Sequence, residues 1–243
     1  MKLPFHSRLV ALICSACGIV GMLLRLWLFT TTDAKGLVTP GHFSDVLAYI
    51  LLAAVLGLLV LYARQVPQQQ RYSKLFPGSL ISAIGCVLGG CGILIHTIGD
   101  LLDRSSMSLL LLPFGIGAFA ALLLLAYFRK MGKRPNVLLL AVPLAYLCLH
   151  AVMQVRLWSN ETQPTVYFFP ILATLFLLLA VYYHAHVTIV QKDLRALVFF
   201  SCACAFLCLV SVPQMPIFYL GLAAWMVCDC CSIPAPRPIG EDA

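Results

Sequence analysis

The chain has 243 residues, of which 62% are hydrophobic and only 10% are charged, with a net charge of +7 and a mean hydropathy of +0.97. A soluble domain needs about 25% charged residues to cover its surface, so this composition excludes a soluble globular protein. The basic residues form no stripe with interleaved aromatic residues, which argues against a nucleic-acid partner.

Long apolar runs recur along the whole chain and predict an all-α, polytopic transmembrane helical bundle with about eight spans. Each run holds about 20 residues, which as a helix matches a hydrocarbon core about 30 Å thick. We expect one transmembrane domain over 1–233 and a disordered, proline-rich cytoplasmic tail over 234–243. The expected spans cover 9–30, 44–63, 78–98, 108–128, 136–155, 166–190, 196–212 and 217–233.

Small residues follow one stripe of the first span and one stripe of the third, and each stripe leads to an ionisable residue. In the first span these residues are Ala11, Cys14, Gly18 and Gly21, followed by Arg25. In the third span they stand at heptad spacing as Ser82, Gly85, Gly89, Gly92, His96, Gly99 and Asp103. Small residues let another helix approach closely in lipid, where packing drives helix association. We therefore expect these two spans to pack tightly and to bring Arg25 and His96 to a common spot beneath the extracytoplasmic surface.

The loops between the predicted spans indicate the orientation through the positive-inside rule. With both termini in the cytoplasm, 12 of the 16 lysine and arginine residues fall on the inside and 4 on the outside. This bias predicts a multi-pass protein of a cell membrane, of the bacterial cytoplasmic type, with the lipid bilayer around it. The last hairpin is the shortest, because 196–212 is brief and Pro213 to Pro216 form a tight turn.

Five polar residues then fall near the outer ends of their helices: Arg25, His96, Asp100, His150 and Gln154. His96 and Asp100 are one helical turn apart and share a face, as do His150 and Gln154. A buried arginine needs a counter-charge in a membrane, and Asp100 or Asp33 is the simplest partner for Arg25. One interpretation is a pocket open to the outside that binds a small polar or anionic ligand, with Arg25 as its anchor. The other is an interfacial cap of side chains that reach water and fix the helix ends.

A zinc site would use the same region, with His96, Asp100, His150 and His42 as nitrogen and oxygen ligands. No HExxH or HxxxH pair supports it and the ligands would come from separate segments, so no metal is expected. His184 and His186 are two residues apart and do not share a helix face, so we interpret them as part of an aromatic belt. Asp229 is near the inner end of the last span, where we expect water to reach it.

The 11 cysteines lie mostly inside apolar runs, and we interpret them as packing residues. Cys14-x-x-Cys17 has redox-motif spacing, but it lies toward the reducing cytoplasm. The sequence has no phosphate-binding loop, GxSxG motif or dinucleotide fingerprint, so we expect no cofactor and assign no catalytic residue.

Three classes of function fit these features. The first is a transporter or membrane-embedded binding subunit, favoured by the outer polar residues and by proline and glycine residues expected to interrupt the third to sixth helices. The second is a non-catalytic subunit that assembles with a membrane protein partner through its glycine stripes. The third is an intramembrane enzyme that uses His96, Asp100 and His150. We favour the first, because a catalytic site usually leaves more polar residues at midplane depth.

Overall fold

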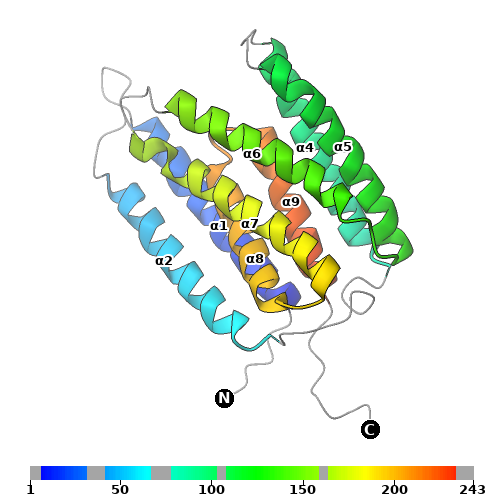
Figure 1. Cartoon of the computed structure of the whole chain (residues 1–243). Helices are drawn as coiled ribbons and strands as arrows, with labels where there is room; N and C mark the ends of the chain where they lie inside the picture. Colours follow the sequence, from blue (N-terminus) through cyan, green and yellow to red (C-terminus); the bar gives the residue numbers. More distant parts are fainter. Residues whose placement is uncertain (1–6, 32–41, 67–77, 103–107, 159–163, 234–243) are drawn as a thin grey trace.

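The computed structural model describes residues 7–31, 42–66, 78–102, 108–158 and 164–233, which form a bundle of α-helices (Figure 1). Residues 234–243, for which the sequence predicts a disordered tail, lie outside the described residues. A 3-10 turn, η1 (Pro164–Tyr167), directly precedes the helix that begins at Phe168. The helices are α1 (Ser7–Thr30), α2 (Phe43–Ala63), α4 (Leu80–Leu102), α5 (Ser108–Met131), α6 (Leu138–Trp158), α7 (Phe168–Val190), α8 (Leu194–Ser211) and α9 (Pro216–Ser232).

Seven of the described helices are long and apolar enough to cross a membrane. The eighth, α9, has 17 residues, which gives it a length of about 26 Å, close to the thickness of a bilayer core. The all-α membrane bundle predicted from the sequence is therefore confirmed. The start of α1 and the end of α9 lie at the same end of the bundle (Figure 1). Following the predicted orientation, we call this the inner end and the opposite one the outer end.

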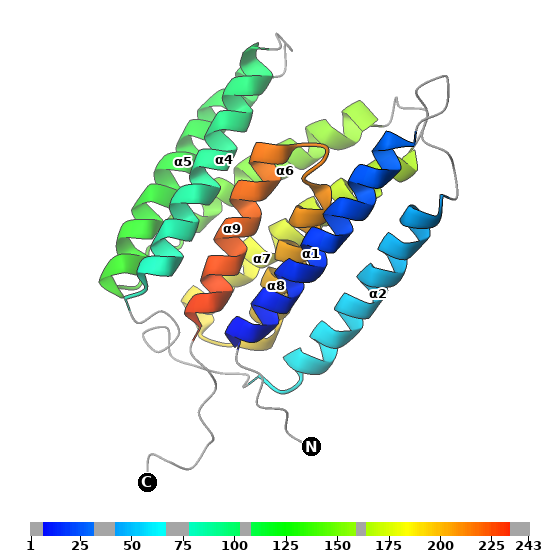
Figure 2. The ribbon, with the colours of Figure 1, turned by 180° about the vertical axis from the view of Figure 1, so that it is seen from behind.

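The last two helices form the centre of the bundle. Every residue from Ser201 to Cys208 in α8 is buried, and α8 contacts α1, α2, α7 and α9. A helix that is apolar on all sides needs such a position, surrounded by other helices. Figure 2 shows α9 between α4 and α1, with α2 at one edge of the bundle and α5 at the other. The peripheral helices expose apolar side chains such as Leu12, Ile50 and Leu109, as helices that face lipid do.

The two stripes of small residues pack against different helices, which corrects the expected pairing of the first and third spans. On α1, Gly18 and Gly21 face Leu209 and Val210 of α8. On α4, Gly85, Gly89 and Gly92 face α9, at Cys228, Trp225 and Gly221, whereas a Cβ at Gly99 would meet nothing within 4 Å. A Cβ added at Gly221 would stand only 2.8 Å from the carbonyl oxygen of Leu88. The backbones of α4 and α9 are therefore in direct contact, and the glycines named here pack inside the chain.

The prolines do not interrupt the helices in the way the sequence suggested. α5 continues through Pro113 and α6 continues through Pro143 without a break. The expectation of broken helices was therefore wrong for these two elements, and it gives no support to a transporter. α4 also extends beyond its predicted end, to Leu102. This extension places Asp100 on the helix, so that it lies one turn beyond His96 on the same face.

Candidate functional site

Four of the five predicted site residues meet at the outer end of the bundle, and we call them the outer cluster. His96 and Asp100 come from α4, and His150 and Gln154 come from α6. The Nε2 atom of His96 lies 3.1 Å from Nε2 of His150 and 3.5 Å from Oδ2 of Asp100. Nε2 of Gln154 lies 3.2 Å from Nε2 of His150. Phe218 of α9 packs against both imidazoles, with ring centroids 4.8 Å and 4.6 Å away.

The outer cluster leads from the surface into the interior of the bundle. The side chain of Asp100 is 37% exposed and that of His96 is 13% exposed. His150 is 1% exposed and Gln154 is 5% exposed. Polar side chains therefore form a continuous row from the solvent-exposed carboxylate of Asp100 to the buried imidazole of His150 and the buried amide of Gln154. An interfacial cap would keep its polar atoms at the surface, so the two buried members do not fit that interpretation.

The contact between His96 and His150 determines which of the two facing Nε2 atoms can carry hydrogen. A hydrogen bond between two imidazole nitrogens requires one nitrogen that carries hydrogen and one that does not. With 3.1 Å between the facing Nε2 atoms of His96 and His150, one of these two nitrogens carries a hydrogen and the other accepts it. A second proton at this contact would turn two N–H groups toward each other and break it.

Two buried polar atoms of the outer cluster make no hydrogen bond in the part of the chain that the structure describes. They are Nδ1 of His150 and Oε1 of Gln154. The hydroxyl of the neighbouring Tyr146 already has a hydrogen-bond partner, because it lies 3.1 Å from Oγ1 of Thr97. The Thr97 hydroxyl in turn donates to the carbonyl of Ile93. Buried polar atoms without partners are costly, so these two atoms are suited to contact a ligand or a water molecule.

Arg25 does not join the outer cluster. Its NH1 atom lies 3.6 Å from Oδ1 of Asp45, and its NH2 atom donates to the carbonyl of Val166 at 2.6 Å. Its guanidinium also lies 5.1 Å from the ring centroids of Phe29 and Phe169. The carboxylate that the structure places beside Arg25 is thus Asp45, whereas the sequence favoured Asp100 or Asp33.

The expected meeting of Arg25 and His96 at one spot was therefore wrong. Arg25 belongs to α1 and His96 to α4, and α9 lies between these two helices (Figure 2). Asp33 lies outside the described residues. An anion-binding pocket needed Arg25 as its cation, so the outer cluster loses the feature that favoured an anionic ligand.

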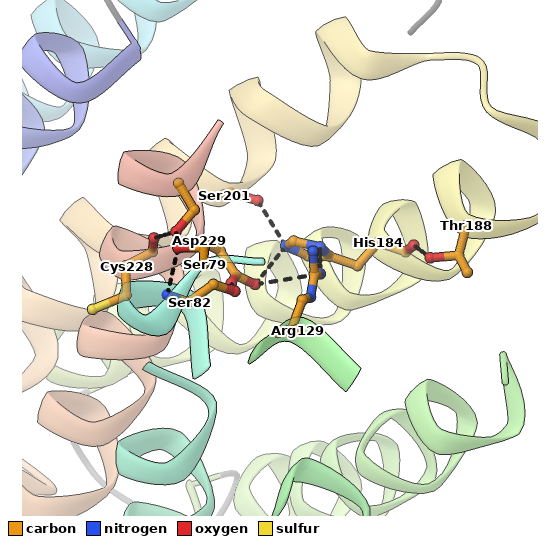
Figure 3. A network of polar contacts seen from close by, with 9 residues as sticks. Ser79, Ser82, Arg129, His184, Thr188, Ser201, Cys228 and Asp229 are labelled. Carbon is orange, nitrogen blue, oxygen red and sulfur yellow. Dashed lines mark hydrogen bonds and ion pairs between the residues drawn. The ribbon is translucent and has the colours of Figure 1, made fainter. Parts of the chain in front are cut away.

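A second polar group, which we call the inner network, was missed by sequence reasoning. It joins Asp229 of α9 to Arg129 of α5 and His184 of α7, and Figure 3 shows the three side chains converging. Oδ2 of Asp229 lies 3.8 Å from NH2 of Arg129 and 3.5 Å from Nε2 of His184. Oδ1 of Asp229 accepts a hydrogen bond from the Ser82 hydroxyl of α4. Ser201 of α8 completes the network, with its hydroxyl 3.4 Å from Nε2 of His184.

The inner network is enclosed, contrary to the interpretation of its members from the sequence. The side chains of Arg129, His184 and Asp229 are each only 1% exposed. Asp229 is therefore not exposed to water, and His184 is not part of an aromatic belt at the membrane surface. The span predicted over 108–128 leaves Arg129 in the following loop. In the structure α5 continues to Met131, and the side chain of Arg129 is buried. The sequence feature that could have indicated the inner network is the carboxylate of Asp229 inside an apolar helix, because a buried charge in a membrane needs a partner.

The hydrogen bonds of the inner network define the tautomer of His184. Arginine has only donors, so the NH2 group of Arg129, 3.3 Å from Nδ1 of His184, must donate to that nitrogen. The imidazole proton then lies on Nε2, directed at Asp229 and Ser201. In a serine hydrolase triad the carboxylate instead contacts Nδ1 and the serine contacts Nε2. The inner network therefore does not have the geometry of a hydrolytic triad.

The other candidate ligands of a metal lie apart from these two groups. His42 contacts the Ser44 hydroxyl through Nδ1 at 2.7 Å, and Nδ1 of His186 lies 3.7 Å from Asp193. Within the described ranges, no three histidine, cysteine or acidic side chains are arranged to hold a metal ion. The 11 cysteines are all described and are free thiols.

No protein-family model, curated protein or solved structure matches the chain. Its function is therefore argued from the outer cluster and the inner network alone.

Proposed function

We propose that this multi-pass membrane protein is a transporter or membrane-embedded binding subunit whose outer cluster takes up a proton and a small polar ligand. One observation carries the proposal: a row of four polar side chains runs from exposed Asp100 to buried Gln154 through two histidines whose facing Nε2 atoms lie 3.1 Å apart. Ionisable groups inside a membrane domain mark substrate pathways and proton relays by default.

The chemistry of the cluster favours a neutral or cationic ligand. Among its four members the only permanent charge is the carboxylate of Asp100. Arg25 lies outside the cluster and forms an ion pair with Asp45. The two buried atoms that make no hydrogen bond, on His150 and Gln154, offer a ring nitrogen and an amide oxygen. A small amine, alcohol or amide has the donors that an amide oxygen and a carboxylate accept.

The assembly-subunit alternative has lost the observation that suggested it. Gly18 and Gly21 of α1 face α8, and Gly85, Gly89 and Gly92 of α4 face α9 of the same chain, so these glycines do not offer a free face to another protein. The enzyme alternative needs a nucleophile or a metal beside the histidines. The outer cluster contains histidine, aspartate and glutamine side chains and no serine, cysteine or lysine.

Thermal-shift measurements on the purified protein test the proposal, with a panel of small amines, alcohols and amides at about pH 8 and about pH 5. A ligand that raises the melting temperature of the wild type should lose its effect in His150→Gln and in Gln154→Leu. The matched control is His186→Gln, which changes a histidine at the inner end and should keep the shift. An equal ligand shift in all four proteins would contradict the proposal.

A further inference from the structure

The neighbours of the two facing Nε2 atoms decide which of these atoms carries hydrogen. Oδ2 of Asp100 lies 3.5 Å from Nε2 of His96. A carboxylate oxygen only accepts, so Nε2 of His96 must present a hydrogen, because otherwise two lone pairs would face each other. Nε2 of Gln154 lies 3.2 Å from Nε2 of His150. An amide NH2 group only donates, so Nε2 of His150 must be an acceptor.

A second contact determines the orientation of the Gln154 amide. Its nitrogen also lies 3.7 Å from Sδ of Met215, in the turn between α8 and α9. A thioether sulfur is a weak acceptor and has no hydrogen to donate. The two hydrogens of the amide nitrogen therefore serve the imidazole of His150 and the thioether of Met215. An amide oxygen in the same place would meet no donor on Met215.

His150 therefore carries its hydrogen on Nδ1. A neutral imidazole has one N–H group and one acceptor nitrogen, and the acceptor here is Nε2, which receives the hydrogen of His96 across the 3.1 Å contact. Nδ1 of His150 and Oε1 of Gln154 are buried and make no hydrogen bond among the described residues. The first is a donor and the second is an acceptor. The outer cluster thus presents two complementary groups to a ligand.

These two groups lie close enough together for one small molecule to contact both. Nδ1 is two bonds from Nε2 in the imidazole ring of His150, and Oε1 is two bonds from Nε2 in the amide of Gln154. The two Nε2 atoms are 3.2 Å apart. Both residues belong to α6 and lie one helical turn apart on one face, so the helix itself holds the donor and the acceptor at a fixed spacing.

Aromatic rings restrict how a ligand approaches His150. The ring of Tyr146 stacks on the imidazole, with centroids 6.0 Å apart and planes at 22°, and Phe218 packs against it with centroids 4.6 Å apart. The N–H bond of Nδ1 lies in the imidazole plane, so its partner must approach the edge of the ring, beside these aromatic side chains. A flat polar group suits this approach better than a tetrahedral one.

We propose that the outer cluster recognises a small neutral amide, such as a carboxamide or a urea, whose carbonyl oxygen accepts from Nδ1 of His150 and whose N–H group donates to Oε1 of Gln154. This inference rests on the proposed function, because it names the class of ligand for the same cluster. An ammonium group offers only donors and a carboxylate only acceptors. Each would therefore leave one of the two buried groups without a partner.

Calorimetric titration of the purified protein with matched three-carbon molecules tests the ligand class. The molecules are propionamide, propylamine, propionate and 1-propanol, and at about pH 8 the amine and the acid are charged. We expect propionamide to bind about tenfold or more tightly than each of the other three, because it alone is flat and has separate donor and acceptor atoms. Equal or tighter binding of any of the other three would overturn the proposal.

Two substitutions at one position test which nitrogen of His150 holds the ligand. In His150→Asn the side-chain nitrogen is as many bonds from Cα as Nδ1 is, whereas in His150→Gln it corresponds to Nε2. Propionamide should therefore bind His150→Asn about tenfold more tightly than His150→Gln. His186→Gln, at the inner end, is the control and should bind as the wild type does. Equal binding to the two His150 variants would contradict the proposal.

Solid-state ¹⁵N NMR of the wild type in lipid bilayers tests the position of the hydrogen even if a variant fails to fold. At about pH 8 we expect His150 to carry hydrogen on Nδ1 and none on Nε2, and we expect propionamide to shift the Nδ1 signal. Hydrogen on Nε2 of His150, or an Nδ1 signal that propionamide leaves unchanged, would overturn the assignment.

The proposed function and this inference can fail separately. If propylamine or 1-propanol binds more tightly than propionamide, and loses its binding in His150→Gln and in Gln154→Leu, the outer cluster is a ligand site and only the amide class is wrong. If every molecule that binds the wild type binds these two variants equally well, the proposed use of the outer cluster is wrong.

Discussion

Arg25 shows how a single charged residue is accommodated in this membrane domain. It is 1% exposed and lies between two phenylalanine rings, with Asp45 of α2 as its counter-charge. The carbonyl of Val166 accepts from its NH2 group, and the same carbonyl accepts from Gln214 at 2.8 Å. Arg25 therefore connects α1, α2 and the segment before α7 at the outer end of the bundle.

Removing only one partner of the pair Arg25–Asp45 should lower the free energy of unfolding more than removing both partners. Asp45→Asn leaves the buried guanidinium without its counter-charge and should lower the free energy of unfolding by about 3–5 kcal/mol, as for other broken buried pairs. The double variant Arg25→Gln/Asp45→Asn should lose less than the sum of the two single variants. Chemical unfolding of the four proteins in a double-mutant cycle measures the coupling. Strictly additive losses would contradict a direct interaction.

Residue spacing was enough to predict the two halves of the outer cluster. His96 with Asp100, and His150 with Gln154, are pairs separated by four positions, and such pairs share a helix face whatever the fold. The meeting of the two pairs, and the choice of Asp45 for Arg25, depend on which helices become neighbours. Helical periodicity carries no information about that choice, because lipid-facing and protein-facing apolar residues have the same composition.

At the level of helices, the contact between α4 and α9 holds the inner and outer groups in place. It is made backbone to backbone, since Cα of Gly92 would stand 2.9 Å from a Cβ at Gly221. The sequence predicted the close approach of α4 to some partner from its glycine spacing. It did not predict α9 as that partner, because only Gly221 in α9 marks the contact.

Gly221→Ala should therefore destabilise the bundle. The new methyl group meets backbone atoms, which cannot rotate away, so the helices must separate at a cost of about 1–3 kcal/mol. Gly99→Ala on α4 is the matched control, because a Cβ there meets nothing within 4 Å. The melting temperature of the purified protein is the measurement. Equal melting temperatures for the two variants would show that α4 and α9 are not in backbone contact.

For the whole molecule, the charge distribution predicts one orientation in the membrane. Among described residues, most exposed lysine and arginine lie at the inner end, at Arg8, Arg64, Lys130, Lys133, Arg134, Lys192 and Arg195, whereas Arg156 lies at the outer end. A cytoplasmic reporter such as green fluorescent protein fused after Lys192 should therefore fluoresce, and alkaline phosphatase fused after Gln214 should be active. The reverse pattern would place the outer cluster in the cytoplasm and would contradict the proposed uptake from outside.

The whole fold is a membrane domain with a polar group at each end of a tight helix contact. Composition and the length of the apolar runs were sufficient to predict the bundle and its helices within a few residues. The inner network could not be predicted in the same way, because Arg129, His184 and Asp229 are far apart in the chain and each also fits a position at the membrane surface. Their burial results from the tertiary packing of α5, α7 and α9.

The proposed function depends most on the hydrogen bond between His96 and His150, and solid-state ¹⁵N NMR of histidine-labelled protein in lipid bilayers tests this contact most directly. His150→Gln and His96→Gln assign the two signals, and His186→Gln serves as a control. At about pH 8 we predict that one of the two facing Nε2 atoms carries hydrogen and that the other does not, with a hydrogen bond between them. Two facing Nε2 atoms that both carry hydrogen, or that both lack it, would contradict the account.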